Sequence, residues 1–377
     1  SASILAATLI PVFVFLSQYH RGSPQAAIGA ILACGILFLH IPFSIWNRPD
    51  VFMALLVVIA VWVANSSEKG RQEWPKAIII SFCAGLAVGM KLHAGVYFAP
   101  IVFFHCAHEN RGFKTFMVMA LIGLALVLLP FSFSTFSLPA FVDWIILHTH
   151  KPSVYMFDPK FMRYGALYFT PVLFYLATWK LPKVGFSLPE KIYLWVFLIS
   201  LVVILYPATK VGAGTHYFFP FMAIFIDQLL RFTGRLRVHK SLAWSLTGSL
   251  VIAIVIIGIP VQKRFFRALN WNEVYGIQSE IRNIMRIYKG RSIEMGIGQD
   301  IKTYPRTYYR TLLVLAGHPY TIDAAPAMEL NKWRFPLPEK TLQGLRKCNT
   351  DLWLIPQGER PFIMTGYYNA PVLDPSF

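Results

Sequence analysis

An arginine and an aspartate stand between two long apolar runs, where their charges suit the handling of a polar substrate. Arg48-Pro49-Asp50 separates the run 26–46 from the run 51–63. Charged side chains at the edge of a membrane segment are costly unless they lie in water or serve a function. Pro49 ends one helix and places Asp50 at the start of the next, where the helix dipole favours a carboxylate. Capping therefore explains Asp50 but not Arg48. We take Arg48 as a substrate-binding candidate and Asp50 as the catalytic candidate.

A cation and an imidazole interrupt a later apolar run. Lys91 and His93 follow the small-residue stretch 85–90, which permits close helix packing, and precede the apolar run 95–106. Two interpretations of Lys91 stay open. Its ammonium either reaches the membrane surface along its apolar stem or is held in a cavity for an anion, for which phosphate is the natural choice.

A glycine-containing loop supplies a second cation. The stretch 209–217 contains Lys210, Gly212, Gly214 and His216 and leads into an aromatic segment. Glycines let backbone N–H groups approach an anion, and the N-terminus of the following helix would point at the same place. The stretch lacks the Gly-Lys-Ser/Thr ending of a nucleotide phosphate loop. We therefore predict that Lys210 and His216 contact a phosphate or substrate that does not belong to a nucleotide.

Two histidines and an arginine belong to the longest polar stretch within the apolar region, 134–163. His148 and His150 are two residues apart, so they share a metal only if they lie on a strand. We expect instead solvated histidines that contact substrate or a lipid headgroup, with Arg163 as a further phosphate-binding cation. We predict no cofactor, and the sequence does not support a divalent cation.

The elements that must position these residues are membrane helices. The chain is 56% hydrophobic, with a mean hydropathy of +0.52. Repeated apolar runs of this kind are typical of a polytopic membrane protein. The sequence predicts about ten spans, at 3–17, 26–46, 51–63, 77–90, 95–106, 115–133, 164–178, 192–206, 217–230 and 241–260.

Charge sets the predicted orientation. The chain has 35 basic and 18 acidic residues. Counted on alternate sides of the spans, thirteen Lys and Arg fall on one side and six on the other, so the richer side is predicted to be cytoplasmic. The other side then holds every candidate named above. The excess also favours contact with anionic membrane lipid, and we expect no nucleic-acid partner.

From residue 261 the composition changes to that of a small α/β domain. Helices are predicted at Trp271–Tyr288, Thr307–Ala316 with Thr307 as N-cap, and Pro338–Lys347; strands are predicted at Ser292–Ile297, Tyr320–Asp323 and Asp351–Pro356. We therefore divide the chain into a transmembrane region, 1–260, and a soluble domain, 261–377, on the outer side. The four cysteines show neither a disulfide framework nor metal-ligand spacing.

With these motifs in hand, residues 1–260 resemble the polyprenyl-phosphate-sugar-dependent glycosyltransferases of the GT-C superfamily, and most closely the aminoarabinose transferase and protein mannosyltransferase branch. Three features carry the resemblance. They are Arg48-Pro49-Asp50 before an apolar span, the stretch 85–93 running into another span, and the stretch 210–214 before an aromatic-Pro span.

The resemblance implies transfer of a hexose or pentose from a polyprenyl-phosphate donor to a lipid, glycan or protein acceptor, usually with inversion. It places the protein in the plasma (inner) membrane as a multi-pass protein with its C-terminal domain outside the cytoplasm. The chemistry asks for a carboxylate base and for cations that hold the departing phosphate. In this group the chief acid lies in the first external loop. No acid precedes Asp50 here, so we expect the chain to lack the N-terminal span and that loop, and Asp50 to position donor or acceptor.

Two other functions fit a membrane protein of this composition. A transporter or flippase of lipid-linked glycans would show repeated halves with interrupted spans, and the sequence has no such repeat. A glycan polymerase or ligase would have a large external loop between late spans in place of a C-terminal domain. The transferase explains the one-sided collection of polar residues better than either alternative.

Overall fold

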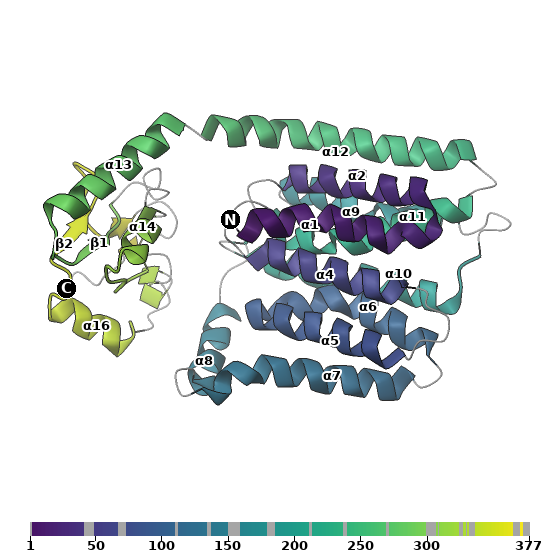
Figure 1. The fold of residues 1–377 in the computed structure, drawn as a ribbon, viewed down its shortest axis with the longest axis horizontal. Helices are drawn as coiled ribbons and strands as arrows, with labels where there is room; N and C mark the ends of the chain where they lie inside the picture. The colour runs from purple at the N-terminus through teal and green to yellow at the C-terminus, as the bar shows by residue number, and fades with distance from the viewer. Residues whose placement is uncertain are drawn as a thin grey trace. The chain divides into compact units, whose positions relative to one another are not determined.

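The fold was analysed in a computed structural model (Figure 1). It describes residues 2–40, 49–66, 73–109, 112–133, 137–149, 159–178, 185–210, 213–236, 240–268, 271–298, 307, 309–323, 327–328, 330–331, 336–364 and 370–371. The chain divides into two compact units, Ser1–Phe266 and Arg267–Phe377. The sequence analysis had placed this division at residue 260.

The first unit is a bundle of helices formed by the apolar runs. Its α-helices are α1 (Ala2–Gln18), α2 (Ser23–Leu39), α4 (Pro49–Asn65), α5 (Glu73–Met90), α6 (Gly95–His108), α7 (Gly112–Leu128), α8 (Leu138–Thr149), α9 (Pro159–Thr178), α10 (Leu188–Ala208), α11 (Met222–Arg235) and α12 (Lys240–Ala268). Short 3-10 helices are η1 (Tyr19–Arg21), η2 (Leu92–Ala94), η3 (Leu129–Ser132) and η4 (Thr215–Phe221). Most of the α-helices lie side by side along one direction (Figure 1).

The lengths of these helices decide which of them are able to cross a membrane alone. Three described stretches are long and apolar enough, namely Ala2–Arg21, Gly112–Ser132 and Leu188–Ala208. Shorter apolar helices include α2 and α4. The 17 residues of α4 extend about 26 Å, against a hydrocarbon core of about 30 Å. The helical membrane class is thus confirmed, whereas the predicted number of ten spans stays a prediction.

Two segments differ from the sequence prediction. The polar stretch 134–163 contains α8, because Leu138, Val142 and Ile146 recur at helical spacing. The predicted span 217–230 begins not as an α-helix but as the seven-residue 3-10 helix η4. Pro220 lies inside η4 and lacks the N–H that an α-helical hydrogen bond would need, so the α-helix α11 begins only beyond it.

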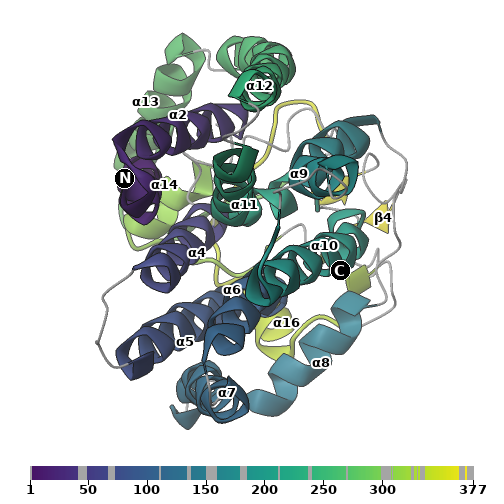
Figure 2. The same cartoon turned by 90° about the vertical axis from the view of Figure 1, so that its right-hand side faces the viewer.

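The core of the bundle lies around α11 and α4. Every residue of α11 from Met222 to Leu230 is buried, and α11 packs against α2, α4 and α9 (Figure 2). The helix α4 also packs against η4 and α5. Its inward face, which includes Val51, Ala54 and Val58, is buried. The two helices that begin nearest the candidate residues are therefore the best enclosed.

The second unit combines helices with a small parallel sheet. Its elements are α13 (Trp271–Ile287), β1 (Ile293–Met295), α14 (Arg310–Leu315), α16 (Glu339–Arg346), β2 (Leu352–Leu354), β3 (Ile363–Met364) and β4 (Ala370–Pro371). Strand β1 pairs with β2 in parallel, with Ile293 opposite Leu352. A separate antiparallel pair joins β3 to β4. One apolar cluster of this unit includes Ile281, Ile293 and Leu313.

Two details of the predicted tail were wrong. Helix α14 begins at Arg310 with Tyr309 as N-cap, so Thr307 does not cap it. No strand forms at 320–323, where the backbone instead hydrogen-bonds to a side chain of β1. Glu294 is buried, and its carboxylate accepts the backbone N–H of Thr321 at 2.7 Å. A buried carboxylate needs such donors, and this bond takes the place of a strand ladder.

Candidate functional site

The start of α4 places a carboxylate inside the bundle. Pro49 is the first residue of the helix and Asp50 the second. Proline suits a first turn because its missing N–H would have no helical partner there. Asp50 lies in the first turn, where the helix dipole stabilises negative charge. The side chain is only 1% exposed, so it faces the protein interior and not bulk water.

Lys91 meets this carboxylate from the end of α5. Helix α5 ends at Met90, and Lys91 has extended backbone before η2 begins. Its Nζ lies 2.7 Å from Asp50 Oδ1. The lysine side chain is 19% exposed. The pair therefore combines a carboxylate enclosed by protein with an ammonium that an incoming anion is able to reach.

Aromatic rings from η4 and α6 form one wall around the ammonium. Lys91 Nζ lies 5.3 Å from the centre of the Tyr217 ring. The ring of His93 stacks on Tyr217 at 4.6 Å between centroids. The hydroxyl of Tyr97 donates to the backbone oxygen of Tyr217 at 2.9 Å. An aromatic face attracts a cation, so Tyr217 provides a second contact that holds Lys91 in addition to Asp50.

Two further histidines belong to the same end of the bundle. His216 is buried at the start of η4, and its ring centroid lies 4.9 Å from that of Tyr217. A side chain on Gly214 would have its Cβ 3.3 Å from His216 Nδ1, so the glycine leaves room for the imidazole. His40, just after α2, lies between Tyr164 and Phe219 at 5.1 and 5.2 Å.

The remaining sequence candidates are less closely connected. Lys210 is half-buried after α10 and places its Nζ 4.5 Å over the ring of Tyr206. Arg163 lies on α9 with its side chain exposed. His148 belongs to α8, but its side chain is outside the described part, as are the whole of Arg48 and His150. Among the described residues, no group of three His, Cys, Asp or Glu is arranged to hold a metal ion.

The structure thus brings together Asp50, Lys91, His93 and His216 from the predicted candidates. It adds His40, Tyr97 and Tyr217 as neighbours. His40 had a detectable signal, because it is a polar, ionisable residue inside the predicted apolar run 26–46. The contact of Tyr97 with η4 had none, because it joins residues from distant parts of the chain.

Comparison with known proteins bears on the part of the chain that carries the ion pair. Residues 1–134 match the family model of dolichyl-phosphate-mannose-protein mannosyltransferases. No curated protein and no solved structure gives a significant match to the chain. The matched segment runs from α1 through α7 and contains Asp50, Lys91 and His93. This match confirms the predicted resemblance and supports a membrane glycosyltransferase of the GT-C superfamily.

Proposed function

We propose that this chain transfers a sugar from a polyprenyl-phosphate donor to an acceptor at the end of the bundle that holds Asp50 and Lys91. The observation that carries the proposal is their 2.7 Å ion pair, which lies inside the segment that matches the mannosyltransferase model. An ion pair in an apolar setting costs several kcal/mol of hydration for each ion, about as much as the attraction returns. Such a pair calls for a function other than stability.

The reaction makes one bond and breaks another at the anomeric carbon. The acceptor hydroxyl attacks this carbon while its bond to the phosphate oxygen breaks, and the hydroxyl proton passes to a base. The donor leaves as polyprenyl phosphate, which carries more negative charge than the phosphodiester did. A preorganised cation stabilises this developing charge most strongly where water is scarce.

Lys91 is the residue we assign to the departing phosphate. Its side chain is 19% exposed, and Asp50 and the Tyr217 ring hold the ammonium in place before any donor arrives. Because the geometry is already set, little reorganisation is needed when the phosphate gains charge.

Asp50 is assigned to holding Lys91. Its Oδ1 lies 2.7 Å from Lys91 Nζ and its side chain is 1% exposed, so the carboxylate is already engaged by the ammonium, which supports positioning over proton abstraction. The two roles separate kinetically. If Asp50 only positions Lys91, the losses in kcat of Asp50→Asn and Lys91→Met overlap in the double variant, whereas they multiply if Asp50 is the base.

His93 offers a second contact to the phosphate. Its Nε2 is buried and has no hydrogen-bond partner among the described residues. A buried polar atom of this kind costs free energy until a ligand or water satisfies it. A phosphate oxygen held by Lys91 would supply that partner. Lys210 and Arg163 are assigned to the outer rim, where the donor and acceptor enter.

The orientation follows from charge. The end that holds Asp50 and Lys91 is the side poorer in Lys and Arg, which supports an extracytoplasmic reaction in the plasma membrane. The C-terminal unit follows α12 and would then lie on the same side. The acceptor is a hydroxyl of a lipid, a glycan or a protein.

The experiment uses the full-length protein in lipid vesicles with a radiolabelled polyprenyl-phosphate sugar and measures release of free polyprenyl phosphate. Lys91→Met keeps the apolar stem and removes the charge, so turnover should fall by about 10² to 10³. Lys114→Met removes an exposed lysine at the start of α7 and serves as the matched control. Normal turnover in Lys91→Met, or movement of labelled donor across vesicles without turnover, would refute the proposal and favour a transporter.

A further inference from the structure

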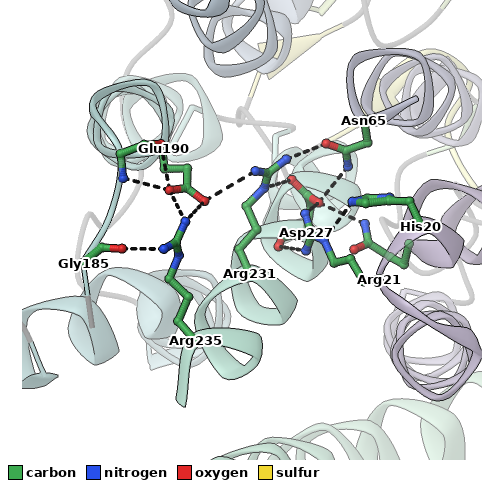
Figure 3. Close-up of polar contacts among 10 residues, drawn as sticks. His20, Arg21, Asn65, Gly185, Glu190, Asp227, Arg231 and Arg235 are labelled. Carbon is green, nitrogen blue, oxygen red and sulfur yellow. Dashed lines mark hydrogen bonds and ion pairs between the residues drawn. The ribbon is translucent and has the colours of Figure 1, made fainter. Parts of the chain in front are cut away.

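A second network of charged side chains lies at the other end of the bundle (Figure 3). Its centre is Asp227 of α11, which is 1% exposed. Asp227 Oδ1 accepts hydrogen bonds from Gln18 Nε2 at 3.0 Å, Arg21 Nη2 at 2.9 Å and Asn65 Nδ2 at 2.8 Å. These residues end α1, η1 and α4. The carboxylate therefore ties three segments to α11.

Arg231 of the same helix links this carboxylate to α4 a second time. Its Nε donates to Asp227 Oδ2 at 2.9 Å, and its Nη2 donates to Asn65 Oδ1 at 2.5 Å. Its guanidinium also lies over the rings of Phe104 and Tyr193, at 4.5 and 5.6 Å. Asn65 thus uses both its amide groups on α11, one toward each charge. This arrangement fixes the end of α4 both along and across the axis of α11.

The arginines of this network are engaged by the protein itself, which argues against a ligand site. Arg21 donates through Nε to His20 and through Nη1 to the backbone oxygen of Asp227, in addition to its Nη2 contact. Arg231 Nη1 lies 3.8 Å from Glu190 Oε1. These contacts give every guanidinium nitrogen of Arg21 and Arg231 a partner within the protein (Figure 3). An anion would have to break existing bonds to enter.

The two helices that meet here also meet at the candidate site. Helix α4 carries Asp50 at its start and Asn65 at its end. The η4–α11 segment carries Tyr217 at its start and Arg231 near its end. At rises of about 1.5 Å per α-helical residue and about 2 Å per 3-10 residue, these stretches span about 22 Å and about 24 Å. The two segments are therefore neighbours of nearly equal length, linked directly through Asn65 at one end and through Lys91 at the other.

We propose that the network of Asn65, Asp227 and Arg231 fixes the axial register of α4 against η4–α11, and so positions Asp50 and Tyr217 around Lys91. The inference rests on the proposed function only for its effect on turnover of the donor at the candidate site. A slide by one α-helical residue moves a side chain about 1.5 Å, and a misplacement of about 1 Å is enough to cost about 10²-fold in rate. The three residues are positioning residues, because none lies at the candidate site.

The polar network suits this task better than the apolar contacts between the helices. Apolar side chains such as Val58 and Ile224 are buried in the same core cluster, but the hydrophobic effect that drives their burial is non-directional. Hydrogen bonds to a buried carboxylate fail when the donor moves by about 1 Å, because their length range is narrow. The register is therefore set at the polar end and transmitted by the rigid helices.

The test measures backbone hydrogen exchange of the full chain in lipid nanodiscs, together with donor kinetics. Asn65→Leu removes both amide contacts at similar volume. It should raise exchange roughly tenfold in peptides that cover η2 and η4 at the distant end, and it should lower kcat more than it raises KM. Arg231→Lys keeps the charge beside Asp227 but cannot bridge to Asn65, so it should show the same distant effect and covers the case in which Asn65→Leu fails to fold.

Thr115→Val is the matched control. Thr115 Oγ1 donates to Glu109 Oε2 at 2.6 Å and joins α7 to the loop after α6, away from α4 and α11. It should leave exchange in η2 and η4 unchanged. If Asn65→Leu and Arg231→Lys raise exchange only around residues 65 and 227, the network is merely local and the inference is overturned. If exchange changes as expected in a chain that never consumes the donor, the proposed function fails while the register role stands.

Discussion

Substitutions in the Asp50–Lys91 pair should affect the stability of the fold and the activity to different extents. Neutralising both charges together, in Asp50→Asn/Lys91→Met, should preserve the fold better than Lys91→Met alone. The reason is that a buried ion pair adds little net stability, whereas one buried charge without its partner is strongly unfavourable.

The magnitudes follow from distance and exposure. At 2.7 Å the attraction is about 6 kcal/mol for an effective dielectric constant of about 20. Loss of hydration by both ions offsets most of it. Lys91→Met leaves Asp50 at 1% exposure without its cation, at a cost of about 3–5 kcal/mol. Asp50→Asn costs about 1–2 kcal/mol, because Lys91 is 19% exposed and its flexible stem is able to carry the charge toward water.

The double variant should lose only about 1 kcal/mol, so the coupling free energy is about 3–5 kcal/mol. Thermal unfolding in one detergent checks the order of stability. Scaled at about 2–4 °C per kcal/mol, Lys91→Met should unfold roughly 6–20 °C below the unmodified protein. Donor turnover should be lost in both Lys91→Met and the double variant.

Arg346→Gln is the matched control for loss of an ion pair. Arg346 lies 3.7 Å from Glu339 on α16, and both side chains are more than 60% exposed. Such a surface pair contributes little, so the midpoint should not move measurably. The reasoning is refuted if Lys91→Met behaves like this control, or if the effects of Asp50→Asn and Lys91→Met simply add.

Three other perturbations test the surroundings. Lys210→Ala should weaken donor use less than Lys91→Met does, because Lys91 is held 2.7 Å from Asp50 at the position assigned to the departing phosphate, whereas Lys210, with its Nζ 4.5 Å over the Tyr206 ring, is assigned to the outer rim; initial rates at low donor concentration measure this. Tyr217→Phe should keep donor KM, whereas Tyr217→Leu should raise it several-fold by removing a cation–π contact of about 1 kcal/mol. The backbone N–H and hydroxyl of Ser292 donate to Asp351 and lower the pKa of its carboxyl. This contact therefore stabilises the tail at pH values above the usual aspartate range, and the stabilisation is lost as pH falls through the lowered pKa. Amide exchange at Ser292, corrected for its intrinsic pH dependence, should show that loss, and Asp351→Asn should abolish it.

The positions of the membrane helices follow from the sequence because hydropathy alone determines them. The run 51–63 became α4 (Pro49–Asn65), and the run 77–90 became α5 (Glu73–Met90). Pro49 and Asp50 mark the start of α4, and Lys91 marks the break after α5. These local signals act within a few residues, so no tertiary information is needed to find them.

The contacts between helices could be identified only from the three-dimensional structure. Charge counting placed Asp50 and Lys91 on the same side of the membrane, but their 2.7 Å separation depends on how α4 packs against α5. The stretch around Lys210 was predicted to favour an anion through glycine conformations. Gly214 instead has an extended φ of 167°, which any residue adopts, and its absent side chain serves to admit His216.

The Asp227 network shows what hydropathy misses in a bundle. The sequence analysis did not single out Asp227, although an aspartate inside a predicted span, four residues before an arginine, is a signal that indicates an ion pair. Helix α11 is buried by α2, α4 and α9, so its side chains need not be apolar to avoid lipid. For such an enclosed helix, a charge is tolerated wherever neighbouring helices supply donors. Charged residues near the middle of weakly apolar segments therefore indicate the centre of a bundle, and they identify the helices whose register the rest of the fold must hold.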